Sequence, residues 1–229
     1  MKAAIMQPYF LPYIGYFQLI NAVDKYILYD DVQFIKGGWI NRNNMLLNRK
    51  KFMFNLLMLG ATPNKLINEI SVQSNQNKLL KTIEISYKKA PYFGVVFPII
   101  NEILNYGNLN LARYLGNSII EICSYLKIET EIIYSSTIQK NNSLKAQDKV
   151  INICKSLQVT TYINAIGGQE LYNKDVFNED AISLLFLKSN LSSYPQFNNE
   201  FIPLLSIIDI MMFNSVAEIR LMLNNYTLI

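Results

Sequence analysis

Short apolar runs alternate with longer segments of helical periodicity along most of this 229-residue chain. Strands that alternate with helices are typical of α/β folds, in which the strands pair in parallel and the helices flank the sheet. The alternation therefore predicts a single α/β domain over residues 1–229, with a mostly parallel sheet. A helical insertion is expected at roughly 77–126 and a helical C-terminal segment at 203–229. The predicted strands are 2–6, 25–29, 51–58, 131–134, 160–165 and 182–188, and the main helices are 15–23, 77–89, 92–105, 110–126, 144–157 and 203–213.

Several residues set the expected boundaries of these elements. Pro91 divides two helices, because the residue before a proline disfavours helical backbone. Pro203 suits the first turn of a helix. Ser215 begins the sequence Ser-Val-Ala-Glu, which is a capping box for a last helix. Residues 36–44 are expected to form a loop.

The composition excludes several kinds of site. The chain has no histidine, which removes the commonest general base and metal ligand and rules out Ser-His-Asp or Cys-His catalysis. Cys123 and Cys154 fit no zinc-binding spacing and are expected to be core thiols of a reduced, cytoplasmic protein. No metal site is therefore expected. Lysine and arginine exceed aspartate and glutamate by 21 − 17 = 4, without dense clusters, so no nucleic-acid partner is expected. No apolar run reaches the ~20 residues of a membrane span.

The stretch QPYFLPYIGY, residues 7–16, occupies the place where ligands bind in parallel sheets, just beyond the carboxyl end of a strand. Gly15 allows close approach to the start of the following helix, whose N-terminus favours a phosphate. The layout resembles the start of nucleotidylyltransferase-like folds. Their His-x-Gly-His box is Tyr13-Ile14-Gly15-Tyr16 here, so that family's nucleotidyl transfer is not expected. Gln7, Tyr9 and Tyr13 are predicted to contact a substrate.

Two adjacent carboxylates follow the second predicted strand. Asp30 and Asp31 should point in different directions, because side chains alternate along a strand. One could bind sugar hydroxyls, and the other could act as a catalytic base. The alternative is that the pair forms and caps a turn.

The segment KGGWINRN, residues 36–43, collects groups that suit a phosphorylated ligand. Arginine offers a fork for phosphate, tryptophan a stacking face, and asparagine both donors and acceptors. The glycine pair would let the loop close over a ligand. The alternative is an exposed hairpin with a partly buried tryptophan. The predicted binding residues here are Lys36, Trp39, Asn41, Arg42 and Asn43, and we expect Gln7, Tyr9, Asp30, Lys36, Arg42 and Asn43 to line one cleft.

Three further positions carry weaker predictions. Lys88 either binds a phosphate or complements the C-terminal dipole of its helix. Asn164 ends a strand before Gly167-Gly168, which could cradle an anion. Asp209 lies in an apolar helical run, where an unpaired carboxylate is costly, so a cationic partner such as Arg42 or a lysine is expected.

The chain resembles the WbqC-like family, which is found among genes for O-antigen and related surface glycans. The resemblance rests on the blocks QPYFLPYIGYF, DDVQF, WINRN, SYKKAPYF and QFNNEFIPLLSIIDIMMFN. Tyr9 and Tyr13 stand where many relatives have His or Trp. The resemblance implies a transferase that forms an amide on a nucleotide-linked amino sugar, with an acyl or aminoacyl donor. The alternative is a non-catalytic protein that binds a nucleotide sugar or a partner. A homodimer stays open.

Overall fold

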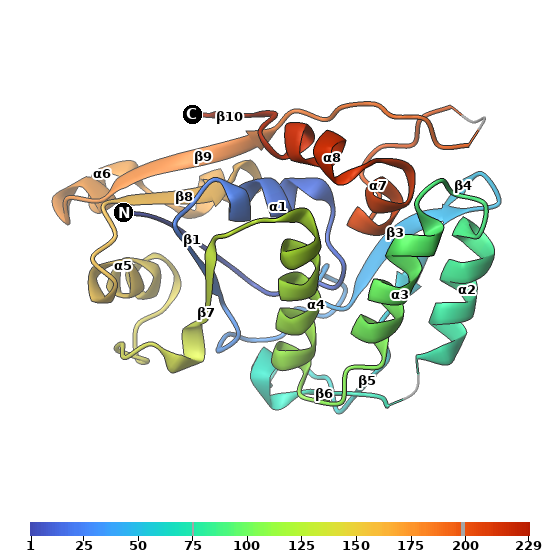
Figure 1. The fold of residues 1–229 in the computed structure, drawn as a ribbon. Coiled ribbons are helices and arrows are strands. Elements are labelled where there is room, and N and C mark those ends of the chain that lie inside the picture. Colours follow the sequence, from blue (N-terminus) through green and yellow to red (C-terminus); the bar gives the residue numbers. More distant parts are fainter. Residues whose placement is uncertain (75, 198–199) are drawn as a thin grey trace.

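A mostly parallel sheet forms the centre of the molecule (Figure 1). The computed structural model describes residues 1–74, 76–197 and 200–229. Five of the sheet's six strands run parallel to one another, and the sixth pairs antiparallel with one of them at one edge. This confirms the predicted fold class. The strands are β1 (Lys2–Met6), β2 (Lys25–Leu28), β7 (Glu131–Tyr134), β8 (Thr161–Ala165), β9 (Ser183–Ser189) and β10 (Tyr226–Leu228).

The strand order fixes where a ligand crevice can open. The order across the sheet is β10-β9-β8-β1-β2-β7. Numbered by their succession in the chain, these strands read 6-5-4-1-2-3, which is the doubly wound order. β1 and β2 pair in parallel through helix α1 (Ile14–Asn21), as the sequence predicts. The order reverses between β1 and β8, so the loops after these strands flank the expected binding crevice.

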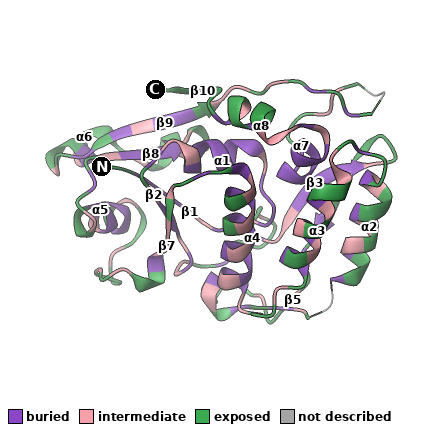
Figure 2. Ribbon diagram, viewed as in Figure 1, coloured by how far each residue is buried: buried purple, intermediate pink, exposed green. Residues whose placement is uncertain are grey.

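The side chains of β1 show how the sheet is buried on both faces. Ala4 belongs to a large core shared with the helices α1, α3, α4, α7 and α8. Ala3 and Ile5 point to the other face, where a smaller core includes residues of α5 and α6. Buried residues accordingly run through the sheet and the inner faces of the helices (Figure 2). These helices are α3 (Phe93–Leu104), α4 (Leu111–Leu126), α5 (Ala146–Ser156), α6 (Lys174–Glu179), α7 (Ile207–Phe213) and α8 (Val216–Leu223).

An antiparallel hairpin stands apart from the main sheet. It pairs β3 (Arg42–Leu47) with β4 (Lys50–Asn55). The predicted loop at 36–44 is therefore wrong at its end, because the polar residues after Arg42 are buried strand residues. A second small sheet pairs β5 (Met58–Leu59) with β6 (Ser71–Val72). The helix α2 (Asn77–Tyr87), followed by α3 and α4, leads from there to β7.

The C-terminal helices start from serine caps. The Ser215 capping box for α8 is confirmed, and its hydroxyl accepts a hydrogen bond from the Glu218 amide. The predicted start of the preceding helix near Pro203 is wrong. Leu204 has a left-handed backbone with φ 58°, and Ser206 caps α7 instead. The sequence does not predict the short strand β10. No helix in the described part of the chain is long and apolar enough to cross a membrane.

The glycine pair after β8 and the two cysteines have local structural roles. Gly167 and Gly168 lie in the first turn of a short 3-10 helix, Ile166–Leu171, which precedes α6. Cys123 and Cys154 are both free and buried, as expected of core thiols. Burial raises the pKa of each thiol to about 12.

Candidate functional site

Three distant segments meet at the loop that follows β1. The carbonyl of Leu11 accepts hydrogen bonds from Asn43 Nδ2 at 2.8 Å and from Ser206 Oγ at 2.7 Å. The amide of Ile207 donates to the carbonyl of Pro12 at 2.9 Å. Leu11 is left-handed, with φ 46°, which costs a non-glycine residue about 1–2 kcal/mol. The hydrogen bonds from β3 and the start of α7 hold this costly conformation in place.

This loop forms one wall of a hollow of about 230 Å³, which we call the aromatic pocket. Aromatic rings and aliphatic groups make most of its surface, and amide and ammonium groups supply its polar points. That composition is typical of small-molecule sites, and the volume suits one ring system of a larger ligand. The lining residues are Tyr9, Pro12, Tyr13, Trp39, Asn43, Asn44, Lys51 and Leu204.

Trp39 and Arg42 place a stacking face and a positive charge side by side at this pocket. The guanidinium carbon of Arg42 lies 5.7 Å from the centroid of the Trp39 ring. Arg42 Nε is buried, and the described residues provide no hydrogen-bond partner for it. They also provide no ion pair for Arg42 within 4.0 Å. The pair therefore sets a flat aromatic surface of the pocket beside a cation that lies behind the lining residues.

The two tyrosines of the pocket supply neutral hydroxyls. Burial raises the pKa of Tyr13 above its ordinary value, and burial together with the neighbouring Tyr13 raises the pKa of Tyr9. Both hydroxyls therefore keep their protons at neutral pH, and they can donate or accept a hydrogen bond but do not act as bases. The Tyr9 ring packs 5.5 Å from that of Tyr16, whose hydroxyl donates to the Gln7 carbonyl at 2.9 Å.

Gly15 is required by Tyr13. A Cβ on Gly15 would lie 2.4 Å from the Tyr13 ring, a distance that side chains do not tolerate. Gly15 is itself buried in the first turn of α1. It shapes the aromatic pocket by letting the Tyr13 ring fold over the start of the helix.

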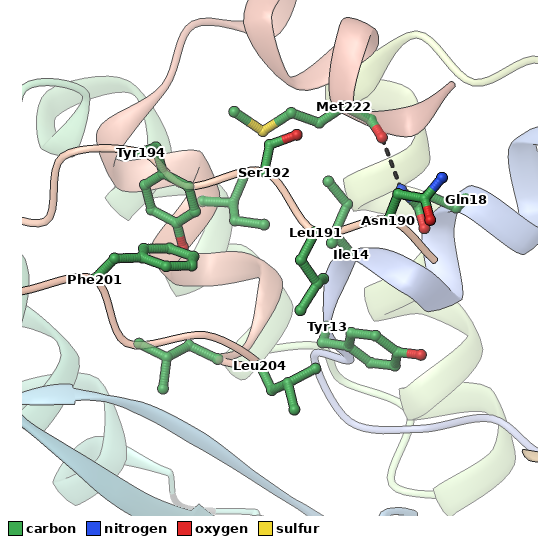
Figure 3. Close-up of a pocket in the computed structure, with 12 residues that line it drawn as sticks. Tyr13, Ile14, Gln18, Asn190, Leu191, Ser192, Tyr194, Phe201, Leu204 and Met222 are labelled. Atoms are coloured by element: carbon green, nitrogen blue, oxygen red, sulfur yellow. Dashed lines mark hydrogen bonds between the residues drawn. The ribbon is translucent and has the colours of Figure 1, made fainter. Parts of the chain in front are cut away.

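A second, smaller cavity adjoins the aromatic pocket at Tyr13 and Leu204, which line both (Figure 3). Its volume of about 20 Å³ is enough for a single water molecule. Gln18 is buried at its edge and donates to the Met222 carbonyl at 2.8 Å. No partner for Gln18 Oε1 occurs among the described residues. This cavity is too small to hold a substrate ring.

The two carboxylates after β2 have partners of their own, away from the aromatic pocket. Asp30 is 1% exposed and accepts hydrogen bonds from the Ser136 amide at 2.9 Å and from its hydroxyl at 2.6 Å. Asp31 pairs with Lys140 at 2.9 Å and with Lys149 at 3.2 Å. Neither carboxylate is among the residues that line the pocket.

Opposing effects act on the pKa of Asp31. Burial alone would raise this pKa. The hydrogen bonds and charges contributed by Lys140, Ser135 and Lys149 outweigh burial, so the pKa lies below its ordinary value. Asp31 therefore stays ionised, and its strong partners make it a weak base.

The remaining predicted residues lie at several places. Asn41 exchanges hydrogen bonds with the backbone of Leu56, and Lys36 is exposed. Asn164 is buried, and its Oδ1 accepts a hydrogen bond from the amide of Ala165. Lys88 lies in a separate groove. Of the six residues expected in one cleft, Tyr9 and Asn43 line the aromatic pocket and Arg42 contacts its wall, whereas Gln7, Asp30 and Lys36 do not line it.

The prediction of a cationic partner for Asp209 is wrong. Its carboxylate accepts hydrogen bonds from the Tyr87 hydroxyl at 2.9 Å, the Tyr194 hydroxyl at 2.7 Å and Gln196 Nε2 at 2.6 Å. These neutral donors satisfy the charge from three sides. Burial is nevertheless the largest effect, and it raises the pKa of Asp209.

Four lining residues, Pro12 among them, escaped the sequence predictions. Asn44 and Lys51 come from the two strands of the hairpin, whose pairing was not predicted from the sequence. Leu204 arrives from the segment before α7. Nothing local in the sequence signals its contact with the loop after β1.

Together the fold and site define an α/β protein with an aromatic, cation-flanked pocket at the carboxyl edge of a parallel sheet. The chain belongs to the WbqC-like protein family, whose pattern matches residues 7–221. An uncharacterized protein of Mycobacterium tuberculosis is 27% identical over 222 residues, which is 95% of each chain. Probable polyketide synthases 7 and 8/35 of Dictyostelium discoideum are 34% and 33% identical over 110 residues, 48% of this chain but only 4% of either synthase. No solved structure matches the chain.

Proposed function

We propose that this protein is a transferase of surface-glycan biosynthesis that binds a nucleotide-linked amino sugar in the aromatic pocket. The proposed reaction is amide formation on the amino group of the sugar, with an acyl or aminoacyl donor. The observation that carries the proposal is the Trp39–Arg42 pair, which sets a stacking surface beside a cation that has no ion pair in the described part of the chain. A nucleotide sugar presents the matching groups, because its flat base can stack on the tryptophan and its diphosphate can pair with the arginine.

The other pocket residues suit the same ligand. Tyr9 and Tyr13 offer neutral hydroxyls to sugar hydroxyl groups. Lys51 adds a second positive charge at the pocket, for the diphosphate. The role in glycan biosynthesis and the nucleotide-linked amino sugar both come from the resemblance to the family, and the pocket supports them with groups that suit such a ligand.

The proposed transfer needs a base. The amine nitrogen attacks the acyl carbon, the bond to the donor's leaving group breaks, and the amine loses a proton. Asp30 and Asp31 are the candidate bases, but neither lines the aromatic pocket. Ser136 donates to both oxygens of Asp30, and two lysines pair with Oδ2 of Asp31, whose Oδ1 is buried without a hydrogen-bond partner among the described residues. This arrangement favours the second candidate function, a binding protein for nucleotide sugars or a partner that performs no transfer.

One experiment separates the two functions. Thermal unfolding is followed with a panel of nucleotide sugars, with and without acyl donors, and products are analysed by mass spectrometry. Stabilisation of the wild type by an amino-sugar nucleotide, lost in Trp39→Ala, together with a new amide product, supports the transferase. Stabilisation without any product across the donor panel supports the binding protein. If no nucleotide sugar stabilises the wild type, the transferase and the nucleotide-sugar-binding protein are both excluded, and only a protein that binds a partner is left.

A further inference from the structure

A second hollow, of about 550 Å³, lies at the turn of the β3–β4 hairpin, against the C-terminal end of α2. We call it the basic groove. It shares no lining residue with the aromatic pocket. Its charged residues are all cations, and no carboxylate is among the residues that line it. The lining consists of Leu46, Asn48, Arg49, Ile85, Ser86, Lys88, Lys89 and Phe197.

The three cations of the groove have no acidic partners in the described part of the chain. Its ion pairs involve other lysines, at positions 25, 140, 149 and 155. The C-terminal dipole of α2 accounts for the presence of positive charges at Lys88 and Lys89, which follow the last turn of that helix. It does not explain Arg49, which reaches the groove from the hairpin and adds a third like charge.

The backbone conformation at Arg49 is a second indication that this arginine has a function. Leu47 pairs with Lys50, so Asn48 and Arg49 form a two-residue turn. Their φ angles are 50° and 61°, as in a type I′ turn, in which glycine is strongly preferred at the second position. The chain thus places a long cation where glycine would be more stable, and backbone strain of this kind is concentrated at functional sites.

We infer that the basic groove is a separate binding site for a phosphate-bearing ligand with at least two negative charges, such as a diphosphate or polyphosphate group. Three converging cations without carboxylates create a local positive potential that such a ligand would neutralise. The arginine fork matches two phosphate oxygens, and the two ammonium groups add point charges. The hollow shape favours a small soluble ligand over a flat membrane surface.

The test is titration calorimetry of the full chain with inorganic tripolyphosphate. Arg49→Gly is the main variant, because glycine fits the left-handed turn and removes only the cation. We expect its dissociation constant to rise about tenfold, the scale of one lost hydrogen bond between charged groups. The double variant Lys88→Ala/Lys89→Ala should raise it further. Lys81→Ala is the matched control, since this lysine is exposed on the same helix outside the groove.

Two further arms locate the site and the source of the phosphate. The double variant Arg42→Ala/Lys51→Ala should bind tripolyphosphate as the wild type does, because it removes the cations at the aromatic pocket and leaves the separate groove intact, so this result is independent of the proposed function. Vesicles of phosphatidylglycerol replace tripolyphosphate in the second arm. Binding of vesicles alone, lost in Arg49→Gly, would assign the site to a lipid phosphate and would overturn the proposal of a soluble ligand with at least two charges. Absence of both interactions, or equal binding by wild type and Arg49→Gly, would overturn the proposal.

Discussion

The side chain of Asn43 donates a hydrogen bond to the carbonyl of Leu11 at 2.8 Å, and this contact joins the hairpin to the loop that follows β1. Asn43 is buried, and its Oδ1 also accepts a hydrogen bond from the amide of Asn44. The same Leu11 carbonyl accepts from Ser206. Asn43 therefore holds the loop of the aromatic pocket in place as well as lining the pocket. Substitutions at this position should lower the stability of the fold in addition to removing any ligand contact.

Asn43→Ala should lower the free energy of unfolding by about 1–3 kcal/mol, because it leaves buried backbone groups without partners. Ser206→Ala should also destabilise the protein, by about 1 kcal/mol. The two losses should not add, since both side chains hold the same carbonyl. Urea unfolding of the single and double variants measures this coupling. Strictly additive losses would show that the two contacts act independently.

The Trp39–Arg42 pair leads to a prediction about affinity. Trp39→Ala should weaken binding of a nucleotide sugar by about 1–3 kcal/mol, the scale of one stacked base. Arg42→Ala should cost on the order of 2 kcal/mol, as for a hydrogen bond to a charged group. Titration calorimetry gives both values.

Lys51 and Lys50 form a matched pair for the same measurement. Lys51 lines the aromatic pocket, whereas its neighbour Lys50 does not and is exposed. Lys51→Ala should weaken binding, and Lys50→Ala should leave it within about twofold, since side chains alternate along the strand. Equal affinities for wild type, Arg42→Ala and Lys51→Ala would remove the diphosphate from the aromatic pocket.

The hairpin turn allows a prediction in the opposite direction, toward higher stability. Arg49→Gly should raise the free energy of unfolding by about 1 kcal/mol, because glycine adopts the left-handed conformation without a steric penalty. Asn48→Gly should gain less, since asparagine tolerates this conformation better than arginine. Urea unfolding of both variants checks the ranking. A destabilised Arg49→Gly would mean that the arginine side chain contributes more to the fold than its strained backbone costs.

The sequence predicts the central sheet well, because its signals are local. β1 and β2 are short apolar runs, and the intervening helical pattern requires a parallel crossover. The hairpin was harder to predict. Asn43 and Asn44 look like loop residues, yet both are buried in β3, where Asn43 serves the carbonyl of a distant loop.

The site is only partly encoded in local patterns. Tyr9, Trp39 and Asn43 stand out in the sequence by residue type and lie together in the structure. Leu204 could not be predicted, because its position depends on how the segment before α7 packs against the loop after β1. The direction of Asp30 was equally hidden, since it is set by Ser136, which lies 106 residues away in the chain.

Asp31 gives a prediction about pH. Its pKa is below the ordinary value in the folded protein, so the folded state holds this proton less tightly than the unfolded chain does. The stability that Asp31 contributes is therefore complete above the ordinary carboxyl pKa of 3.8 and is lost as the pH falls from that value toward the folded pKa. Asp209 acts in the opposite sense, because its raised pKa favours folding as the pH falls.

Asp31→Asn should lower the free energy of unfolding at pH 7 by about 3 kcal/mol, because it leaves Lys140 and Lys149 buried without their shared carboxylate. The variant should also lose less stability than the wild type between pH 4 and pH 3, since the titrating group is gone. Urea unfolding across this range measures both effects, with Glu129→Gln as the control for an exposed carboxylate. Parallel pH profiles for wild type and Asp31→Asn would show that Asp31 titrates alike in the folded and unfolded chains, and the ion pairs with the two lysines would then contribute nothing to folding.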